Sequence, residues 1–402
     1  MRFPKLTELD KDQNEIYNGA PPEGTVLIIG PPGTGKTVIA FHRAQMLSRL
    51  KRNPRVIMYN KVLSQYTSSR GSVAPDVEVQ TLHKWAYDWW KRSIRGSGDP
   101  PCVDGARFDH DWSAIQDAAI KKSIDSAGAK LVNWGHLIID EGQDFPPSLY
   151  ACLTNVMTVA NAKGSLPKLA VTVLADENQR LRPGRNSNIE EIRQNLLLGP
   201  ENFFHLKKNY RSTKQIAEFA SCFYVGLRSG KPIAPSSIGE LPVVSWIERD
   251  TEGKFLDACA TKIARYADIR RTEEIGVLTV RDKVRSSIFN RLNAKLDEKK
   301  IKVQSYSSKD EELKATNLEF DLPGSVTVIN SASAKGLEFD TVFLIDPGAL
   351  VSTGSGDLEA KMAMYVLCSR PRRFLNVMLV EDANSKKLMK DVSKAIYEEE
   401  NL

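Results

Sequence analysis

Residues 30–37 read Gly-Pro-Pro-Gly-Thr-Gly-Lys-Thr and directly follow the apolar run 26–29, which is suited to a strand. This GxxxxGK[ST] spacing is typical of a phosphate-binding loop, in which backbone N–H groups surround the phosphates of a nucleotide. In such a loop Lys36 would reach the terminal phosphates, and the Thr37 hydroxyl would bind Mg²⁺. Residues 37–47 favour a helix whose N-terminus would face the same anion. The residues predicted to bind a nucleotide here are Gly33, Thr34, Gly35, Lys36 and Thr37.

A second element suited to nucleotide hydrolysis is the apolar run 137–139, which is followed by Asp140 and Glu141. Asp140 is placed to bind Mg²⁺ directly or through water, and Glu141 is placed to orient and deprotonate the attacking water. A buried strand with an acidic edge is the alternative interpretation. Because the pair follows a phosphate-binding loop in the same half of the chain, we expect the catalytic role.

Short apolar runs, separated by helix-like stretches, must position these residues. The runs of the first half lie at 25–29, 55–59, 77–82, 137–140 and 169–175, and the rhythm restarts at 243–247, 275–280, 302–306, 326–330, 341–345 and 374–380. This alternation predicts the α/β class, with parallel sheets covered by helices on both faces. The turn-favouring pair Gly199-Pro200 indicates a boundary between a first domain at 1–200 and a second at 201–402.

The composition is that of an ordinary globular protein, with 41% hydrophobic and 26% charged residues. No apolar run approaches the ~18 residues that span a bilayer. The start of the chain also lacks a signal-peptide core, so we expect a cytoplasmic protein without a membrane partner. The five cysteines are scattered and lack CxxC spacing, which argues against a zinc or iron–sulfur site and fits a reducing compartment.

The charge pattern is mildly basic, with a net charge of +6 that permits nucleic-acid binding without demonstrating it. Basic residues gather at 180–185, 207–208, 270–271 and 370–373. The acidic tail 398–400 is expected to be a solvated chain end.

The order of the later motifs resembles that of the UvrD/Rep-like superfamily 1 helicases over nearly the whole chain. The residues that carry the resemblance are Asp140-Glu141-Gly142-Gln143-Asp144 (similar to DExQD), Leu174-Ala175-Asp176-Glu177-Asn178-Gln179 (GDxxQ), Asn209-Tyr210-Arg211-Ser212 (NYRS), Ala334-Lys335-Gly336-Leu337-Glu338-Phe339 (AKGLEF) and Tyr365-Val366-Leu367-Cys368-Ser369-Arg370 (YVALTRA). The resemblance implies two tandem RecA-like P-loop domains, with ATP and Mg²⁺ bound in a cleft between them.

The resemblance also implies roles for single residues. Gln179 would sense the γ-phosphate, and Arg211 and Arg370 would act on that phosphate from the second domain. The residues implied at the adenosine are Gln13 and Tyr210 at adenine, and Gly336 and Glu338 near the ribose. Arginines supplied across a cleft stabilise transition-state charge and can raise the rate by ~10³-fold or more. A surface salt bridge for Arg211 and a merely basic surface for Arg370 are the alternatives.

The candidates for nucleic-acid contacts follow strands of the first half or lie in two of the later motifs. They are Tyr59, Asn60, Lys61, Thr81, His83, Arg182 and Lys335. Hydroxyl, amide and lysine groups suit phosphate contacts, and aromatic side chains suit base stacking. For Trp85, Trp89 and Trp90 we expect helix packing, and for His83 either a phosphate contact or a packed histidine.

Several features depart from the family pattern. Gln179 is followed by the basic residues 180–185 without an aromatic, so a backbone-gripping or RNA-tolerant mode stays open beside base stacking. Ser331-Ala332-Ser333 replaces the Thr-x-His that usually precedes the AKGLEF box. The chain also lacks room for the large accessory insertions of longer relatives. Residues 30–44 are similar to the HelD-like branch, which includes a partner of RNA polymerase.

Two functions from different classes follow. The first is an ATP-dependent translocase or helicase motor that moves on single-stranded nucleic acid, with DNA favoured over RNA. The second is a regulatory or motor ATPase subunit of a larger complex, with a partner such as a nuclease or RNA polymerase and little unwinding of its own. A P-loop kinase or an unrelated NTPase would require the later motifs to be accidents.

Overall fold

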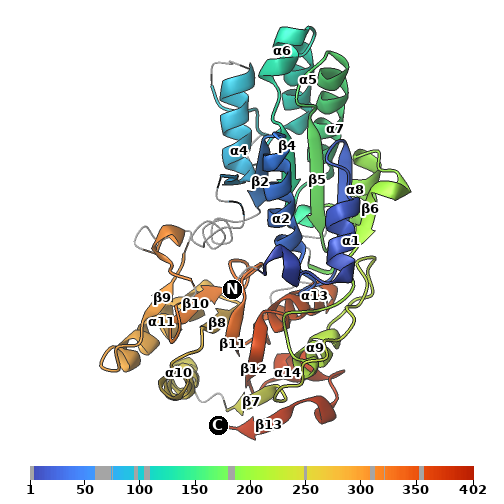
Figure 1. The fold of residues 1–402 in the computed structure, drawn as a ribbon. Coiled ribbons are helices and arrows are strands. Elements are labelled where there is room, and N and C mark those ends of the chain that lie inside the picture. The colour runs from blue at the N-terminus through green and yellow to red at the C-terminus, as the bar shows by residue number, and fades with distance from the viewer. Residues whose placement is uncertain are drawn as a thin grey trace.

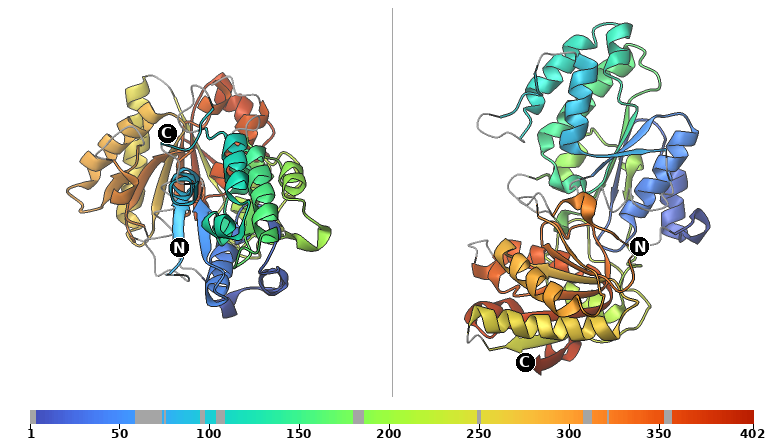
Figure 2. Two further views of the ribbon diagram at one scale, coloured as in Figure 1. Left: turned by 90° about the horizontal axis from the view of Figure 1, so that it is seen from above. Right: turned by 90° about the vertical axis from the view of Figure 1, so that its left-hand side faces the viewer.

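The computed structural model of the protein describes residues 4–58, 74, 76–94, 98–103, 109–179, 186–248, 251–307, 313–320, 322–352 and 357–402. The chain folds into two α/β bodies, each built on a parallel sheet, and the second body follows the first along the chain (Figure 1). The right-hand view of Figure 2 shows the first body above the second. The α/β class and the two parallel sheets expected from the sequence are confirmed.

The first body has a six-stranded sheet in which every neighbouring pair is parallel. In spatial order its strands are β3 (Glu78–Thr81), β2 (Pro54–Met58), β4 (His136–Ile139), β5 (Ala170–Ala175), β1 (Thr25–Ile29) and β6 (Phe203–His205). Because β1, β4 and β5 are parallel neighbours or near neighbours, the loops that follow them meet at one edge of the sheet. This edge carries the phosphate-loop sequence and the acidic pair.

Helices cover both faces of this sheet. One face packs against α1 (Lys11–Gly19) and α2 (Lys36–Arg49), and the other against α4 (Leu82–Trp89), α5 (Trp112–Lys122), α6 (Ser126–Leu131), α7 (Pro147–Ala162) and α8 (Ile189–Asn195). Side chains alternate along a strand. Val26 and Ile28 therefore join the hydrophobic cluster of α2, whereas Leu27 and Ile29 join that of α4 to α8.

The second body has a seven-stranded parallel sheet. In spatial order its strands are β13 (Glu398–Asn401), β7 (Val243–Ile247), β12 (Pro371–Val380), β11 (Phe339–Ile345), β8 (Ile275–Thr279), β10 (Val326–Asn330) and β9 (Val303–Ser305). One face packs against α10 (Glu252–Ile269) and α11 (Asp282–Leu296). The other packs against α9 (Lys214–Ser221), α12 (Ala349–Ser352), α13 (Asp357–Cys368) and α14 (Ala383–Met389).

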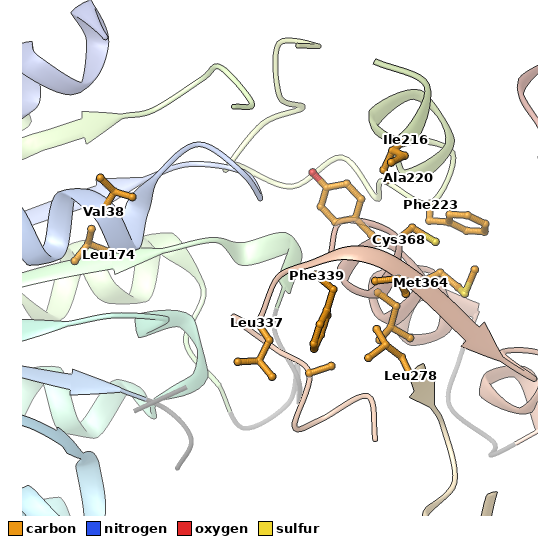
Figure 3. Packing of buried hydrophobic residues seen from close by; sticks show 14 of the residues in the cluster. Val38, Leu174, Ile216, Ala220, Phe223, Leu278, Leu337, Phe339, Met364 and Cys368 are labelled. Atoms are coloured by element: carbon orange, nitrogen blue, oxygen red, sulfur yellow. The ribbon is translucent and has the colours of Figure 1, made fainter. Parts of the chain in front are cut away.

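The packing of α9 against α13 supports the segment that leads into Arg370. Ile216, Ala220 and Phe223 lie on the side of Met364 and Cys368 and share one hydrophobic cluster with them (Figure 3). The last turn of α13 is therefore held by buried apolar contacts immediately before the arginine. A well-packed support of this kind restricts where the arginine side chain can reach.

The eleven strands expected from the apolar runs all form, and two further strands complete the sheets. The acidic tail is one of them: residues 398–401 form β13, which pairs with β7, and Ser245 Oγ donates a hydrogen bond to Glu400. The backbone of the tail is therefore part of the sheet edge and not a free chain end, whereas the side chains of Glu398 and Glu399 are exposed as expected. The other is β6, through which the first sheet continues past residue 200. We propose that the domain boundary lies between β6 and β7.

Candidate active site

The phosphate loop joins the end of β1 to the start of α2. Gly33 and Gly35 both have positive φ angles, of 78° and 88°. A Cβ atom on Gly35 would lie 2.4 Å from Gln13 Nε2, and one on Gly33 would lie 2.2 Å from Asn209 Oδ1. Only glycine combines this backbone with such close neighbours. The loop therefore packs between α1 and the segment that contains Asn209.

Lys36 is the first residue of α2, and its side chain is only 7% exposed. Its ammonium donates to the carbonyl oxygens of Gly30 at 2.6 Å and Pro31 at 3.2 Å, and lies 4.0 Å from Asp176 Oδ2. Burial lowers the pKa of Lys36, although the carboxylates of Asp176 and Glu141 oppose this shift. The lysine thus lies within the loop that its sequence predicts.

Asp140 and Glu141 follow β4 at the same sheet edge. Thr37 Oγ1 donates to Asp140 Oδ2 at 2.8 Å, which joins the start of α2 to the end of β4. Glu141 has a positive φ of 54°, a conformation that is costly for a residue other than glycine and recurs at functional sites. Gln143 Nε2 donates to Glu141 Oε2 at 2.6 Å and fixes the direction of that carboxylate.

The two neighbouring carboxyl groups have opposite pKa shifts. Burial and the charge of Glu141 raise the pKa of Asp140. Burial would also raise the pKa of Glu141, but the cations Lys335 and Lys36 outweigh it and lower that pKa. Glu141 is consequently held in its ionised form, the form that a general base requires.

The residues present fit a Mg²⁺ ion. The Thr37 hydroxyl and the Asp140 carboxylate are adjacent oxygen donors, which this hard cation prefers, and Asp140 is buried. No group of three or more His, Cys, Asp or Glu side chains in the described part of the chain could hold a metal ion by itself. A Mg²⁺ ion commonly takes one or two protein ligands and completes its sphere with phosphates and water.

The second body contributes two arginines to the site that contains Lys36 and Glu141. Arg370 is 1% exposed, and its Nη2 donates to Gln179 Oε1 at 2.5 Å. Arg211 Nε donates to Glu338 Oε1 at 2.7 Å, and its Nη1 donates to the carbonyl oxygen of Ser369 at 3.1 Å. Burial lowers the pKa of Arg370 to about 10, so the guanidinium stays charged at neutral pH.

The far end of the site is formed by Gln13 and Tyr210. Gln13 Nε2 donates to the carbonyl oxygen of Thr34 at 3.1 Å, and its backbone N–H donates to the N-cap Asp10 at 2.9 Å. The Tyr210 hydroxyl donates to Asp10 Oδ2, and its backbone N–H donates to the carbonyl oxygen of Gly33 at 2.8 Å. The Tyr210 ring remains 40% exposed and is therefore accessible to a flat ligand.

These groups line one cavity of about 460 Å³ between the two bodies. Its lining includes the following residues of the sequence-predicted nucleotide site: Gln13, Gly33, Gly35, Lys36, Thr37, Glu141, Gln179, Tyr210, Arg211, Gly336, Glu338 and Arg370. Thr34 lies within the loop but is fully buried, and its hydroxyl donates to the carbonyl oxygen of Pro31 at 2.9 Å. Asp140 reaches the site through its contact with Thr37.

The comparison with protein families agrees with a nucleotide site in the first body. Residues 13–185, which contain the phosphate loop and the acidic pair, match the model of an AAA domain. The later motifs that resemble superfamily 1 helicases meet this domain at the cavity. The first body is thus similar to an AAA domain, and the later motifs of the chain resemble those of superfamily 1 helicases. A comparison with curated proteins gave no match.

Two solved structures with a TM-score of 0.50 share the fold of this chain, and a third matches it less closely. Mss116p bound to ssRNA and AMP-PNP is 12% identical with a TM-score of 0.50, over 99% of this chain and 78% of that chain. The DUF1998 helicase MrfA bound to DNA is 11% identical with a TM-score of 0.50, over 94% of this chain and 49% of that chain. The C-terminal domain of a possible DNA helicase from Lactobacillus plantarum is 22% identical with a TM-score of 0.34, over 47% of this chain and 98% of that chain. This chain thus spans about half the length of MrfA.

Those residues predicted to contact nucleic acid that the structure describes do not meet at one place, in contrast to those of the nucleotide site. Tyr59, Asn60, Lys61 and Arg182 lie outside the described residues. The three remaining candidates, Thr81, His83 and Lys335, have partners within the protein. Thr81 Oγ1 accepts a hydrogen bond from the Lys84 backbone N–H and so caps α4.

His83 is exposed, and its ring lies 5.2 Å from that of His110. The His83 Nδ1 is 3.3 Å from His110 Nε2. The helix-packing interpretation holds for the three tryptophans. Trp85 and Trp89 are buried, with ring centroids 5.3 Å apart, and the partly buried Trp90 packs against the same hydrophobic cluster.

Lys335 has a different position from the one expected for a strand contact. Its ammonium is 1% exposed and donates to Asp144 Oδ2 and to the carbonyl oxygen of Gln179, the latter at 2.5 Å. It also lies 3.7 Å from Glu141 Oε2. In this conformation Lys335 joins the two bodies beside the acidic pair and is not accessible to a strand, because carboxylates of the first body attract and enclose its charge.

Asp176 and Asn209 are two further residues of the site without a predicted role. Asp176 lies between the Lys36 ammonium and Gln179, whose Nε2 donates to Asp176 Oδ2 at 2.6 Å. Asn209 supports the phosphate loop, since its Oδ1 accepts from the Arg211 backbone N–H at 2.9 Å next to Gly33. Both belong to motifs that the sequence shows, so their motif positions were the available signal. Within the described residues, no helix is both long and apolar enough to cross a membrane.

Proposed function

We propose that this protein is an ATP-dependent translocase or helicase motor of the UvrD/Rep-like kind, which hydrolyses ATP between its two domains. One observation carries the proposal: Lys36 and Glu141 of the first domain share a cavity with Arg211 and Arg370 of the second. Phosphoryl transfer depends mainly on positioning and on charge stabilisation, and these four groups supply both.

Lys36 and the loop backbone would bind the phosphates of ATP. The Lys36 ammonium already lies among the loop carbonyls, and α2 begins at this residue, so its N-terminus faces the same place. Thr37 and Asp140 would hold Mg²⁺, which would shield the charge of the phosphates. Tyr210 and Gln13 lie at the other end of the cavity, where the base would rest.

Glu141 would accept the proton of the attacking water. The hydrogen bond from Gln143 fixes its carboxylate, and its lowered pKa keeps it ionised at neutral pH. A positioned general base contributes about 10²–10⁴-fold to a rate. Gln143 is therefore a positioning residue for Glu141.

Arg211 and Arg370 would stabilise the charge that develops on the γ-phosphate. Both side chains have protein partners, Glu338 and Gln179, from which they would turn toward the phosphate. An arginine that arrives from a second domain makes hydrolysis depend on how the two domains are placed. Hydrolysis and domain motion would then be coupled, as a motor requires.

Single-stranded nucleic acid is the proposed track of the motor. The net charge of +6 is compatible with a polyanion, and similar folds are solved with DNA or with ssRNA. We favour DNA over RNA on the resemblance to UvrD/Rep-like proteins.

A second candidate is a motor or regulatory ATPase subunit of a larger complex, with a partner such as a nuclease or an RNA polymerase. The burial of Lys335 and the capping role of Thr81 favour it, because both were candidates for strand contacts and both have structural partners. In this function the same domain motion would act on a protein partner.

ATP turnover by the full chain with no polymer, single-stranded DNA, single-stranded RNA or blunt duplex tests the proposal, with Lys36→Ala as the inactive control. Stimulation by one single-stranded polymer supports the motor and identifies its track. Turnover that no polymer stimulates, together with no unwinding of a tailed duplex, supports the subunit. Unchanged turnover in Lys36→Ala would show that the nucleotide site is wrongly assigned.

A further inference from the structure

A second cavity, of about 400 Å³, lies beside the nucleotide cavity in the second domain. Two basic clusters that are 100 residues apart in the sequence meet there: Arg270 from the end of α10, and Arg372 and Arg373 from the start of β12. Arg372 also lines the nucleotide cavity, so the two cavities share a wall. We refer to this second space as the arginine cavity.

The three arginines of the arginine cavity differ in how far they reach solvent. Arg373 is exposed, and no ion pair connects it with an acidic residue of the described part of the chain. The Arg270 side chain is 49% exposed, and Arg372 is half-buried at the base. Arg270 and Arg373 therefore present guanidinium groups to whatever enters.

The carboxylates around the arginine cavity mostly have partners inside the protein. Glu273 is buried and accepts hydrogen bonds from Thr341 Oγ1 at 2.6 Å and Tyr266 Oη at 3.0 Å. Its other oxygen lies 3.9 Å from Arg270 Nη1.

At the base of the cavity, Arg372 lies 3.3 Å from Glu274 Oε2 and 3.1 Å from Asp340 Oδ1. Only Glu240 is largely exposed, 4.0 Å from Arg270 Nη2. Cations thus dominate the solvent-facing charge of the arginine cavity.

The remaining walls suit a ligand with polar groups and one flat part. Tyr266 and Phe374 stack in parallel, with ring centroids 5.5 Å apart, and both line the cavity. The exposed Ser237 and the N-cap Thr213 add hydroxyl groups. Planar guanidinium groups bind phosphate oxygens through paired hydrogen bonds, which suits Arg more than Lys to this task.

We propose that the arginine cavity binds a phosphate group, either as a free anion such as pyrophosphate or as part of a small nucleotide, independently of the phosphate loop. The site requires Arg270 and Arg373, and it lies on the second domain next to the nucleotide cavity. A mononucleotide is within the size of this cavity, and the aromatic pair offers a surface for its base.

Calorimetric titration of the full chain with pyrophosphate tests the proposal. Because pyrophosphate also suits the phosphate loop, the titration uses Lys36→Ala, which lacks the main cation of that loop. We expect Lys36→Ala to keep one pyrophosphate site, and the added pair Arg270→Ala and Arg373→Ala to weaken it by about tenfold or more. Arg265→Ala, an exposed arginine one turn earlier on α10, is the matched control and should not change the affinity.

The source of the phosphate group follows from a second titration, with ADP in place of pyrophosphate. Tighter binding of ADP assigns a nucleotide, and equal binding assigns the phosphate alone. The proposal is overturned if neither probe binds Lys36→Ala, or if binding persists in the Arg270→Ala and Arg373→Ala pair. It is also overturned if a glutamate hexapeptide binds and both phosphate probes do not, since the cavity would then dock an acidic protein segment. These results do not depend on whether the nucleotide cavity hydrolyses ATP.

Discussion

The guanidinium of Arg370 donates a hydrogen bond to Gln179 Oε1 at 2.5 Å, across the junction between the two domains. Gln179 in turn donates to Asp176 Oδ2 at 2.6 Å, and that oxygen lies 4.0 Å from the Lys36 ammonium. A continuous series of polar contacts thus runs from the second domain to the phosphate loop. A change at the phosphates can be transmitted along it to the placement of the second domain.

Replacement of Glu141 by glutamine should lower ATP turnover by about 10²-fold or more, because the amide cannot take the proton of the attacking water. ATP binding should persist, since the two side chains have the same shape and Lys36 is unchanged. Turnover and equilibrium binding of ATP check both parts. Glu15→Gln, on the exposed face of α1, is the matched control, and equal turnover of the two variants would rule out Glu141 as the base.

Lys335→Met should move the acid limb of the pH–rate profile to higher pH. The Lys335 charge lowers the pKa of Glu141, so its loss lets that pKa rise, and Glu141 then becomes protonated at a higher pH as the solution is acidified. The profile of turnover against pH measures this shift. Lys335→Arg keeps the charge and should retain the wild-type limb. A limb that stays in place in Lys335→Met would show that Lys335 does not act on Glu141.

Gly35→Ala should abolish ATP binding, whereas Gly24→Ala should not. Both glycines have positive φ, of 88° and 77°, so both substitutions should cost about 1–2 kcal/mol in the free energy of unfolding. Only the Gly35 methyl group would also collide with Gln13 Nε2, because nothing lies within 4 Å of a Cβ atom at Gly24. Urea unfolding and ATP titration separate the two effects. Equal ATP affinity in the two variants would contradict the close packing of the loop against Gln13.

The buried His136 should make the protein less stable as the pH falls. Burial and the nearby Arg43 lower the pKa of His136 to about 3, from the model-peptide value of 6.5. Between these values the unfolded chain binds one more proton than the folded protein, so stability rises with pH there, by up to about 1.4 kcal/mol per pH unit. Urea unfolding across this range should show the slope in the wild type and a smaller slope in His136→Gln. Equal slopes in the two proteins would show that a group other than His136 causes the loss of stability at low pH.

The strands of both sheets could be predicted because buried parallel strands are nearly continuous apolar runs. The two that escaped prediction lack this signal. Strand β6 has three residues, and β13 reads Glu-Glu-Glu-Asn, so only its backbone pairing with β7 makes it a strand. Polar edge strands of this kind depend on the neighbour that they join, which the local sequence does not contain.

The nucleotide site could be predicted to a large extent from motifs, because a phosphate loop requires a fixed local sequence. What the motifs could not give is the pairing of side chains from distant segments. Lys335 and Asp144 are 191 positions apart, and their contact depends on how the two domains meet. For the same reason the sequence alone did not show that the basic segments at 270–271 and 370–373 share one cavity.

The most direct test of an ATP site shared by two domains is the ATP turnover of Arg370→Ala. Arg370 lies in the second domain and donates to Gln179 of the first, so its removal should lower turnover by ~10³-fold while Lys36 and the loop still bind ATP. Arg265→Ala, an exposed arginine that does not line the nucleotide cavity, should keep wild-type turnover. Turnover in Arg370→Ala equal to that of the wild type would contradict hydrolysis between the two domains.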